Sequence, residues 1–211
     1  MAKNIEPRLR KIGEYLTLDE KSIFVIPEYQ RAYSWGIKQC DKLWQDIEDF
    51  IENGGEDPYF FGTIIINCQE DDTKLSLIDG QQRTTTFILL LKALLIKLNQ
   101  VIGETERDVD SKRLARTLTM KRDRVIKILY KAKDEIIFDI LEDFENATTE
   151  NILENNSINE LYKAELKTIL DSDIYETAEE KVVKIKYKQK DNKYTNYFRN
   201  FKFFMRNLMN Y

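Results

Sequence analysis

Short runs of β-branched and aromatic residues occur at three places in the first eighty residues. The first is Ser22 to Ile26, which ends at Pro27. The other two, Tyr59 to Asn67 and Lys74 to Ile78, are separated by a polar turn. Such residues favour strands, and proline closes a strand because it has no backbone N–H to donate. The pattern predicts one strand followed by a β-hairpin.

Between and after these runs, apolar residues recur every three or four positions. From Cys40 to Ile51 they predict one amphipathic helix of about 16 residues, with Ser34 as its N-cap and Asn53-Gly54-Gly55 as its end. The stretch from Thr84 to Val101 is apolar on nearly all sides, which predicts a helix covered by other helices. Residues Ile5 to Leu16 predict a helix or an irregular arm.

The second half of the chain has helical spacing almost throughout. An aromatic stripe near its end, which includes Tyr197, Phe201 and Phe204, is more typical of a core than of a base-stacking platform. We therefore predict an α+β fold: a small mixed sheet with a helical cap and a helical C-terminal half. The predicted division is a core at residues 1–103 and a helical region at 104–211. Further helices are predicted at Leu114–Met120, Val125–Leu129, Ile136–Phe144, Ile158–Leu170 and from Tyr194 to Leu208.

Charge is distributed in blocks along this half. The net charge is −4, so no overall basic field indicates nucleic acid. Yet residues Lys112 to Lys133 contain nine Lys or Arg and one acid, Asp134 to Glu180 contain fifteen acids and two lysines, and Lys181 to Arg206 contain nine cations and one acid. Such blocks are usually solvated helix faces. The basic ones remain candidate surfaces for DNA or another partner.

Composition excludes several classes of function. The chain has no histidine, which excludes a Ser-His-Asp triad, a His-ligated zinc site and a nuclease centre that needs a His base in this chain. The two cysteines, Cys40 and Cys68, indicate a reducing compartment. The longest apolar run, Phe87 to Leu98, is interrupted by Lys92 and is shorter than the roughly 20 residues that span a bilayer. We expect a cytoplasmic protein with no membrane partner.

The turn between the second hairpin strand and the long helix is the strongest candidate site. Its sequence is Asp79-Gly80-Gln81-Gln82-Arg83-Thr84-Thr85-Thr86. Asp79 and Gln82 fit a capping box, which would by itself mean only that a helix begins here. Arg83, however, places a cation at the positive end of the helix dipole, and no acid follows it before Glu104. A phosphate bound by the helix N–H groups, Arg83 and the threonine hydroxyls would resolve this conflict.

A second group of candidates follows the first strand. Gln30 and Arg31 lie among Tyr29, Tyr33 and Trp35. Arginine offers a planar fork for phosphate, and an aromatic ring can stack on a base. Taken alone, this loop favours the simpler interpretation, in which the three aromatic side chains wedge it into the core and Arg31 is solvated. If two strand ends of one small sheet converge, Arg31 and Arg83 would face one ligand.

Three segments in this order closely resemble a known family. They are Ile26-Pro27-Glu28-Tyr29-Gln30-Arg31-Ala32-Tyr33-Ser34-Trp35, Phe60-Phe61-Gly62-Thr63-Ile64 and Leu77-Ile78-Asp79-Gly80-Gln81-Gln82-Arg83-Thr84-Thr85. The resemblance is to the N-terminal domain of GmrSD-type restriction proteins, the DGQQR-motif family with a ParB/sulfiredoxin-like fold. It extends from about residue 12 to 100, and Asn196-Tyr197-Phe198 is similar to a segment seen late in that domain.

The resemblance implies a nucleoside triphosphate as ligand, defence against phage or foreign DNA, and coupling to a nuclease domain. Mg²⁺ is expected from the chemistry of the phosphates, because such sites bind it through phosphate oxygens. The resemblance also implies that Gly80, Gln81, Gln82, Arg83, Thr84 and Thr85 line the phosphate site, and that Gln30 and Arg31 close it. Asp79 and Arg83 would be the catalytic pair if the nucleotide is hydrolysed. Tyr29, Tyr33 and Trp35 would stack on the base or form the pocket wall, and no residue is assigned as a metal ligand.

We therefore expect a nucleotide-binding regulatory domain of a DNA-targeting restriction protein, with nucleotide hydrolysis left open. Without histidine, nuclease activity is not expected of this chain, and its nuclease would be a C-terminal or separate domain. One alternative is a module that binds DNA or senses a modified base without hydrolysing nucleotide. Another is a structural interaction domain in which Asp79 to Arg83 only caps a helix.

Overall fold

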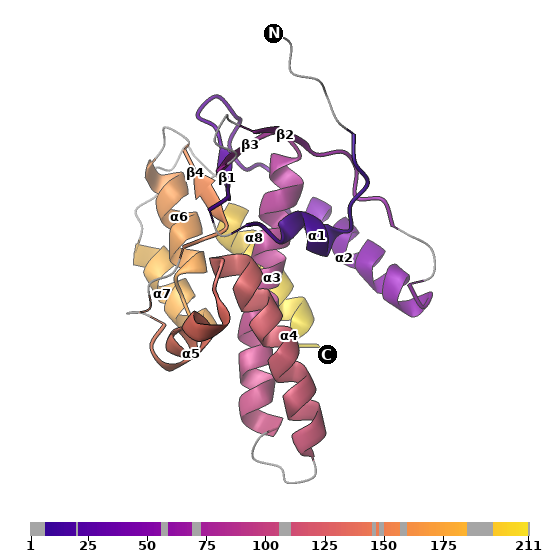
Figure 1. Ribbon diagram of the computed structural model, residues 1–211, viewed down its shortest axis with the longest axis vertical. Coiled ribbons are helices and arrows are strands. Elements are labelled where there is room, and N and C mark those ends of the chain that lie inside the picture. Colours follow the sequence, from indigo (N-terminus) through magenta and orange to yellow (C-terminus); the bar gives the residue numbers. More distant parts are fainter. Residues whose placement is uncertain are drawn as a thin grey trace.

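The computed structural model describes residues 7–19, 21–55, 59–68, 73–105, 111–144, 147, 150–156, 160–184 and 196–210 (Figure 1). Within these ranges the chain forms eight helices and one four-stranded sheet. The sheet contains both parallel and antiparallel pairs, and helices account for most of the second half. The predicted α+β class is confirmed.

The strands lie in the order β2-β3-β1-β4. Strand β1 pairs in parallel with β3 and with β4, whereas β2 and β3 are antiparallel. Because β1 and β3 run in the same direction, their carboxyl ends meet at one edge of the sheet. The two predicted candidate segments both leave the sheet from this edge. The strand bounds are Ile23–Ile26 for β1, Ile65–Cys68 for β2, Lys74–Asp79 for β3 and Leu153–Asn155 for β4.

Two strand predictions need correction. The run predicted from Tyr59 is a strand only from Ile65 onward, and Gly62 before it has a positive φ of 94° that interrupts extended pairing. Strand β4 was not predicted, because three residues are too short to show a pattern. It forms because β1 offers it a partner: Phe24 N–H donates to the carbonyl of Ile152 at 3.0 Å.

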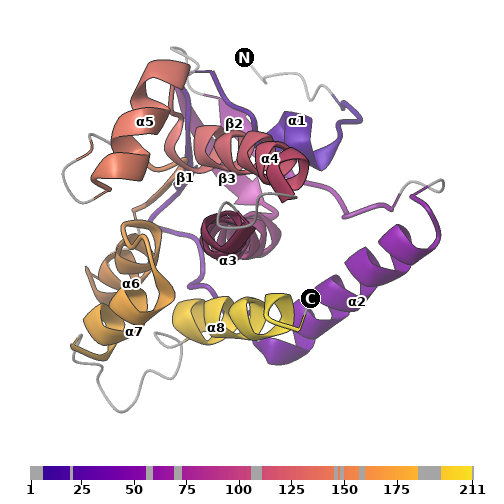
Figure 2. The same cartoon turned by 90° about the horizontal axis from the view of Figure 1, so that it is seen from below.

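Helix α3, Gln81–Thr105, is the central element of the fold (Figure 2). Helix α4, Lys112–Tyr130, and helix α8, Asn196–Leu208, pack along opposite sides of it. Among the described residues, α3 is the one helix long and apolar enough to cross a bilayer. Its packing shows it to be a core helix, as predicted. The division at residue 103 remains a prediction, although α4 and α8 both pack directly on α3.

The remaining helices mostly follow the predicted ranges. The N-cap of α2 is Gly36, so the prediction of Ser34 as cap was wrong. Helix α4 is one uninterrupted helix, although two shorter ones were predicted, and α7 was not predicted at all. The N-terminal prediction holds for α1, while residues 7–11 are irregular and residues 1–6 lie outside the described ranges. The bounds are Ile12–Leu16 for α1, Ile37–Glu52 for α2, Asp134–Glu142 for α5, Glu160–Leu170 for α6 and Tyr175–Lys184 for α7.

The aromatic stripe of α8 lies in the core, as predicted. Tyr197, Phe201 and Phe204 are buried, and the ring of Tyr197 stacks on that of Tyr33 with centroids 4.7 Å apart. Tyr194, predicted as the first member of the stripe, lies outside the described residues. The stripe attaches the end of the chain to the loop that follows β1.

Candidate functional site

The turn from β3 into α3 depends on a single glycine. Gly80 has a φ of 86°, and a Cβ built on it would lie 2.7 Å from the Cγ1 atom of Ile64. Both the backbone conformation and the lack of space therefore require glycine. With the chain reversed at this residue, α3 begins at Gln81, and Thr84 N–H donates to the carbonyl of Gly80 at 2.9 Å.

The amide side chains of the motif hold the opposite loop. The Oε1 atom of Gln82 accepts from the backbone N–H groups of Ser34 at 2.7 Å and Trp35 at 3.1 Å. Gln81 Nε2 donates to the carbonyl of Arg31 at 3.0 Å. Both glutamines are buried. The expected capping role of Gln82 is therefore wrong, because its side chain is engaged by the loop after β1.

A reciprocal bond comes from that loop. Gln30 Nε2 donates to the carbonyl of Ile78, the penultimate residue of β3, at 2.8 Å. Gln30, Arg31, Gln81 and Gln82 are thus brought together, as the sequence predicted. The side chains of Gln81 and Gln82 join the two segments, so they present only backbone N–H groups toward a ligand.

Arg83 lies in the first turn of α3, beside two acceptors. Its guanidinium donates to the carbonyl of Thr63, and its Nη2 atom lies 3.6 Å from Oδ2 of Asp79. The Nε atom is buried and has no hydrogen-bond partner among the described residues. A carboxylate therefore does offset this cation, contrary to expectation: it belongs to Asp79, which precedes Arg83 by four residues. Exposed ion pairs at such distances contribute little, about 0–1 kcal/mol.

The threonines of the motif lie behind this turn. Thr84, Thr85 and Thr86 are fully buried. The Thr84 hydroxyl shares a hydrogen bond of 2.8 Å with the hydroxyl of Tyr15, and Thr85 Oγ1 has no partner among the described residues. The position of Thr84 and Thr85 next to the turn agrees with the sequence, but their side chains face the core.

The three candidate aromatic residues differ in exposure. Tyr33 is fully buried and its hydroxyl hydrogen bonds with Thr86 and Asn200, so the expectation that it stacks on a base is wrong. Trp35 is half-buried and packs against the core. Tyr29 is 72% exposed. Of the three, Tyr29 has the ring that is free to meet a ligand.

The sequence did not identify Asn200 as part of this arrangement. Its Nδ2 atom donates to the hydroxyl of Tyr33 at 2.7 Å and to the carbonyl of Trp35 at 2.9 Å. Asn200 lies on α8, far along the chain, and no local pattern around it indicates such a role. The one available signal was that Asn200 lies within the aromatic stripe of α8, a polar residue among residues predicted to be buried.

The buried phenols at this site stay protonated. Burial raises the pKa of Tyr15 to about 12, and it raises the pKa of Tyr33 still further above its usual range. Burial also raises the pKa of the Cys40 thiol to about 12. These groups therefore act as neutral hydrogen-bonding groups at neutral pH. Among the described residues, no group of three or more His, Cys, Asp or Glu residues could hold a metal ion.

The fold and site define a helix-rich α+β domain. In it, the turn from β3 through Gly80 into α3, which carries Asp79 and Arg83, is hydrogen bonded to the loop after β1 that carries Gln30 and Arg31. The model of the family described as GmrSD restriction endonuclease, N-terminal domain, matches residues 12–211. The chain therefore belongs to this family, and its role is in restriction. The match extends across the helical half, well beyond the segments that carried the resemblance. No curated protein matches the chain.

Proposed function

We propose that this domain binds a nucleoside triphosphate at the edge where the first turn of α3 meets the loop after β1. One observation carries the proposal. Within the described residues, the backbone N–H groups of Gln81, Gln82 and Arg83 have no acceptor, and the Arg83 side chain in the same turn is 29% exposed. Unpaired donors at a helix N-terminus bind phosphate oxygens well.

Two further residues fit such a ligand. Arg31 is exposed on the facing loop, whose backbone is held against the motif by Gln81. Tyr29 is exposed on the same loop and offers a ring for stacking on a base, a contact worth roughly 1–3 kcal/mol. Phosphate and base would thus be bound from two segments that the sheet brings together.

Magnesium would be held mainly through the phosphate oxygens and water. The site offers one carboxylate for it, that of Asp79, whose side chain is 61% exposed. Mg²⁺ accepts such sparse protein ligation, because it usually keeps several waters and binds through one or two carboxylates. When bound, the ion would neutralise charge on the phosphates. If hydrolysis occurs, Asp79 would orient a water, and Arg83 would stabilise charge on the phosphate.

Family membership supports a wider role for this nucleotide site. We propose that nucleotide binding regulates a DNA-cleaving nuclease part of the restriction protein, in the cytoplasm where nucleoside triphosphates and invading DNA meet. The rival function is a module that binds DNA or a modified base through Arg31 and Arg83 without nucleotide. Salt separates the two functions, because DNA affinity falls steeply as salt rises.

The test is a thermal-shift panel of the four ribonucleoside triphosphates with Mg²⁺. At a nucleotide concentration 100-fold above Kd, binding stabilises the folded state by about 2.7 kcal/mol. For a chain of this size that corresponds to a rise in Tm of about 5–10 °C. Arg83→Ala and Arg31→Ala should lose most of this shift. The matched control Arg206→Ala, which removes an exposed arginine from α8, should keep it.

Arg31→Ala is the informative variant if Arg83→Ala proves unstable, because the Arg31 side chain is exposed and forms no hydrogen bond or ion pair with the described residues. No shift with any of the four nucleotides in the wild-type chain would end the nucleotide proposal. A shift in Tm that remains in both Arg83→Ala and Arg31→Ala would mean that the nucleotide binds at another site.

A further inference from the structure

Helix α4 has one buried side and one strongly basic side. Ala115, Val125 and Leu129 are buried on the side that packs against α3. Seven side chains of the helix are cationic and exposed or half-buried, and five of these form no ion pair with a described residue. We call these five residues the α4 basic face: Lys112, Arg113, Arg116, Lys121 and Arg124.

The charges of the α4 basic face are not neutralised within the fold. None of its five residues forms an ion pair with a described residue. The other cations of the helix do: Arg122 pairs with Asp123 at 2.9 Å, and Lys127 pairs with Asp134. Asp123 and Asp134 are thus engaged by other cations, and among the described residues no ion pair neutralises the face on a protein whose overall charge is −4.

Further cations lie on the neighbouring segment before α1. A Cβ built on Gly13 would lie 3.4 Å from the Nη2 atom of Arg124, so α1 lies next to α4. Arg10 and Lys11, just before α1, are exposed. Glu14 on α1 accepts a hydrogen bond from the backbone of Lys11.

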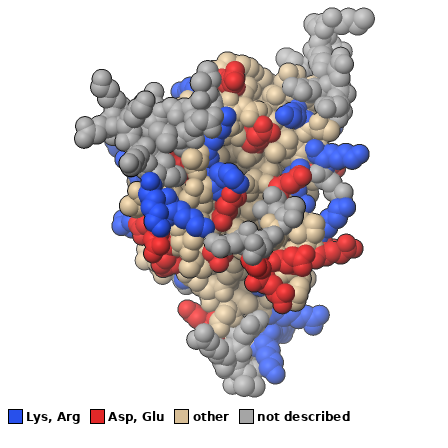
Figure 3. Space-filling model, turned by 90° about the vertical axis from the view of Figure 1, so that its left-hand side faces the viewer, with Lys and Arg blue, Asp and Glu red and all other residues tan. Residues whose placement is uncertain are grey.

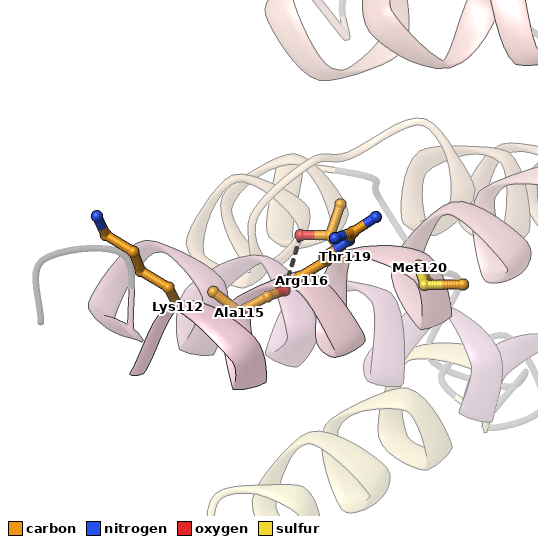
Figure 4. A pocket seen from close by; sticks show the side chains of 5 residues that line it. All are labelled: Lys112, Ala115, Arg116, Thr119 and Met120. Atoms are coloured by element: carbon orange, nitrogen blue, oxygen red, sulfur yellow. Dashed lines mark hydrogen bonds between the residues drawn. The ribbon is translucent and has the colours of Figure 1, made fainter. Parts of the chain in front are cut away.

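At its N-terminal end the face encloses a shallow hollow (Figure 4). Lys112 and Arg116 line it together with Ala115, Thr119 and Met120. The Thr119 hydroxyl donates to the carbonyl of Ala115 at 2.9 Å, so the polar groups left for a ligand here are the two cations. The rest of its lining is largely apolar, so the hollow offers a partner two cations at an open surface and not an enclosed anion site.

The shape of the molecule leaves this face accessible. Helices α3 and α4 extend together beyond the rest of the fold (Figure 1). On the side shown in Figure 3, Asp and Glu side chains lie mainly across the middle of the molecule, and Lys and Arg side chains lie above and among them as well as at the lower end. A long polyanion could therefore contact α4 where this helix extends beyond the rest of the fold.

We propose that the α4 basic face binds the phosphate backbone of duplex DNA. From Lys112 to Arg124 the helix rises about 18 Å, at 1.5 Å per residue. Phosphates of one DNA strand follow each other at about 3.4 Å along the duplex axis, so the face can meet about five of them. An acidic protein fits less well, because the centres of protein–protein interfaces are depleted in charged residues. This surface is separate from the proposed nucleotide site.

The test is fluorescence anisotropy of the whole 211-residue chain with a labelled duplex of about 20 base pairs, without nucleotide, at salt concentrations between about 50 and 200 mM. Five phosphate contacts predict a slope of log affinity against log salt of about −4.5. Arg113→Gln with Arg116→Gln should reduce the slope to about −2.7 and weaken binding at low salt by at least about tenfold.

Two matched variants sharpen this result. Lys38→Gln with Lys184→Gln removes the same charge from exposed sites on α2 and α7 and should leave both quantities unchanged. Arg113→Lys with Arg116→Lys keeps the charge and should restore most of the binding. All these side chains are exposed, so thermal unfolding should show each variant folded.

Three outcomes would overturn the proposal. The first is no binding of duplex by the wild-type chain at low salt. The second is an equal loss of affinity in the α4 variant and in the α2/α7 control, which would mean that only net charge matters. The third is displacement of the duplex by polyglutamate as readily as by unlabelled DNA, which would indicate an acidic protein as partner. None of them bears on nucleotide binding.

Discussion

Helices α3 and α4 both begin with cations in their first turn, but the two starts have opposite surroundings. At the start of α3, Arg83 is three-quarters buried, bonded to the carbonyl of Thr63 and close to Asp79. At the start of α4, Lys112 and Arg113 are exposed and have no ion pair among the described residues. The same local feature is thus built into the fold in one place and left open to solvent in the other.

This difference changes what a cation at a helix start indicates. The unfavourable interaction with the helix dipole, roughly 0.3–1 kcal/mol, is the same at both places. At α3 a neighbouring carboxylate reduces it, and the case for a ligand rests on unpaired donors. At α4 no described residue forms an ion pair with these cations, and the case for a ligand rests on a whole row of like charges. The two helix starts therefore predict different effects when their cations are replaced.

The largest effect is expected at the turn that begins α3. Gly80→Ala would place a Cβ 2.7 Å from Ile64 in a left-handed conformation, so we expect the free energy of unfolding to fall by about 2–4 kcal/mol. Gly103→Ala is the control within the same helix, because its Cβ would meet nothing within 4 Å. It should stabilise the protein by about 0.5–1 kcal/mol. Urea unfolding of both variants measures the difference, and equal effects would contradict this description of the turn.

A smaller effect that depends on pH is expected where α3 and α4 are joined. Lys92 of α3 is fully buried and donates to the hydroxyl of Tyr130 on α4 and to the carbonyl of Leu170. Burial lowers the pKa of Lys92 from 10.5 to about 7, against the opposing influence of Asp171 and Asp173. The folded protein thus binds this proton more weakly than the unfolded chain does.

The sign of the pH effect follows from that shift. The contribution of Lys92 to stability is lowest below pH 7, rises between pH 7 and 10.5, and is complete above. Lys92→Met should therefore raise the free energy of unfolding at pH 6 by about 1–3 kcal/mol, because it removes a buried charge. The Leu170 carbonyl keeps the hydroxyl of Tyr130 as donor at 2.7 Å.

At pH 9 the gain from Lys92→Met should largely disappear. Lys97→Met, on the same helix but only half-buried, should show no such pH dependence. Chemical unfolding of the wild type, Lys92→Met and Lys97→Met at pH 6 and pH 9 tests this pH dependence. A gain of the same size at pH 6 and pH 9 would mean that packing, and not charge, decides the effect.

The smallest effect concerns the two helix starts themselves. Arg113→Glu exchanges a cation for an anion at the positive end of α4 and should raise the free energy of unfolding by about 0.3–1 kcal/mol at low salt. The gain should fade as salt increases. Arg83→Ala, without ligand, should instead lower stability slightly because the Thr63 carbonyl loses its donor. A stabilising Arg83→Ala would mean that this bond contributes nothing.

Local patterns were sufficient for much of this molecule. Strands β1 and β3, the long helix α3 and the aromatic stripe of α8 were all predicted. In each case the hydrophobic pattern or the residue that ends the element lies within a few residues of chain. The convergence of the Gln30-Arg31 loop and the Asp79-to-Arg83 turn was also predicted, from the expectation that two strand ends of one small sheet meet. Their proposed ligand remains to be tested.

Tertiary contacts decided the rest. Strand β4 exists because β1 has an open edge, and Tyr33 is core because Asn200, 167 residues away, donates to its hydroxyl. The side chain of Gln82 was available for a cap by sequence, but the loop after β1 uses both its amide atoms. The sequence by itself determined the long helices and the strands β1 and β3, since periodicity and turn residues act locally. Only the folded structure decided which polar groups are satisfied and which stay open, because that depends on residues brought together from distant parts of the chain.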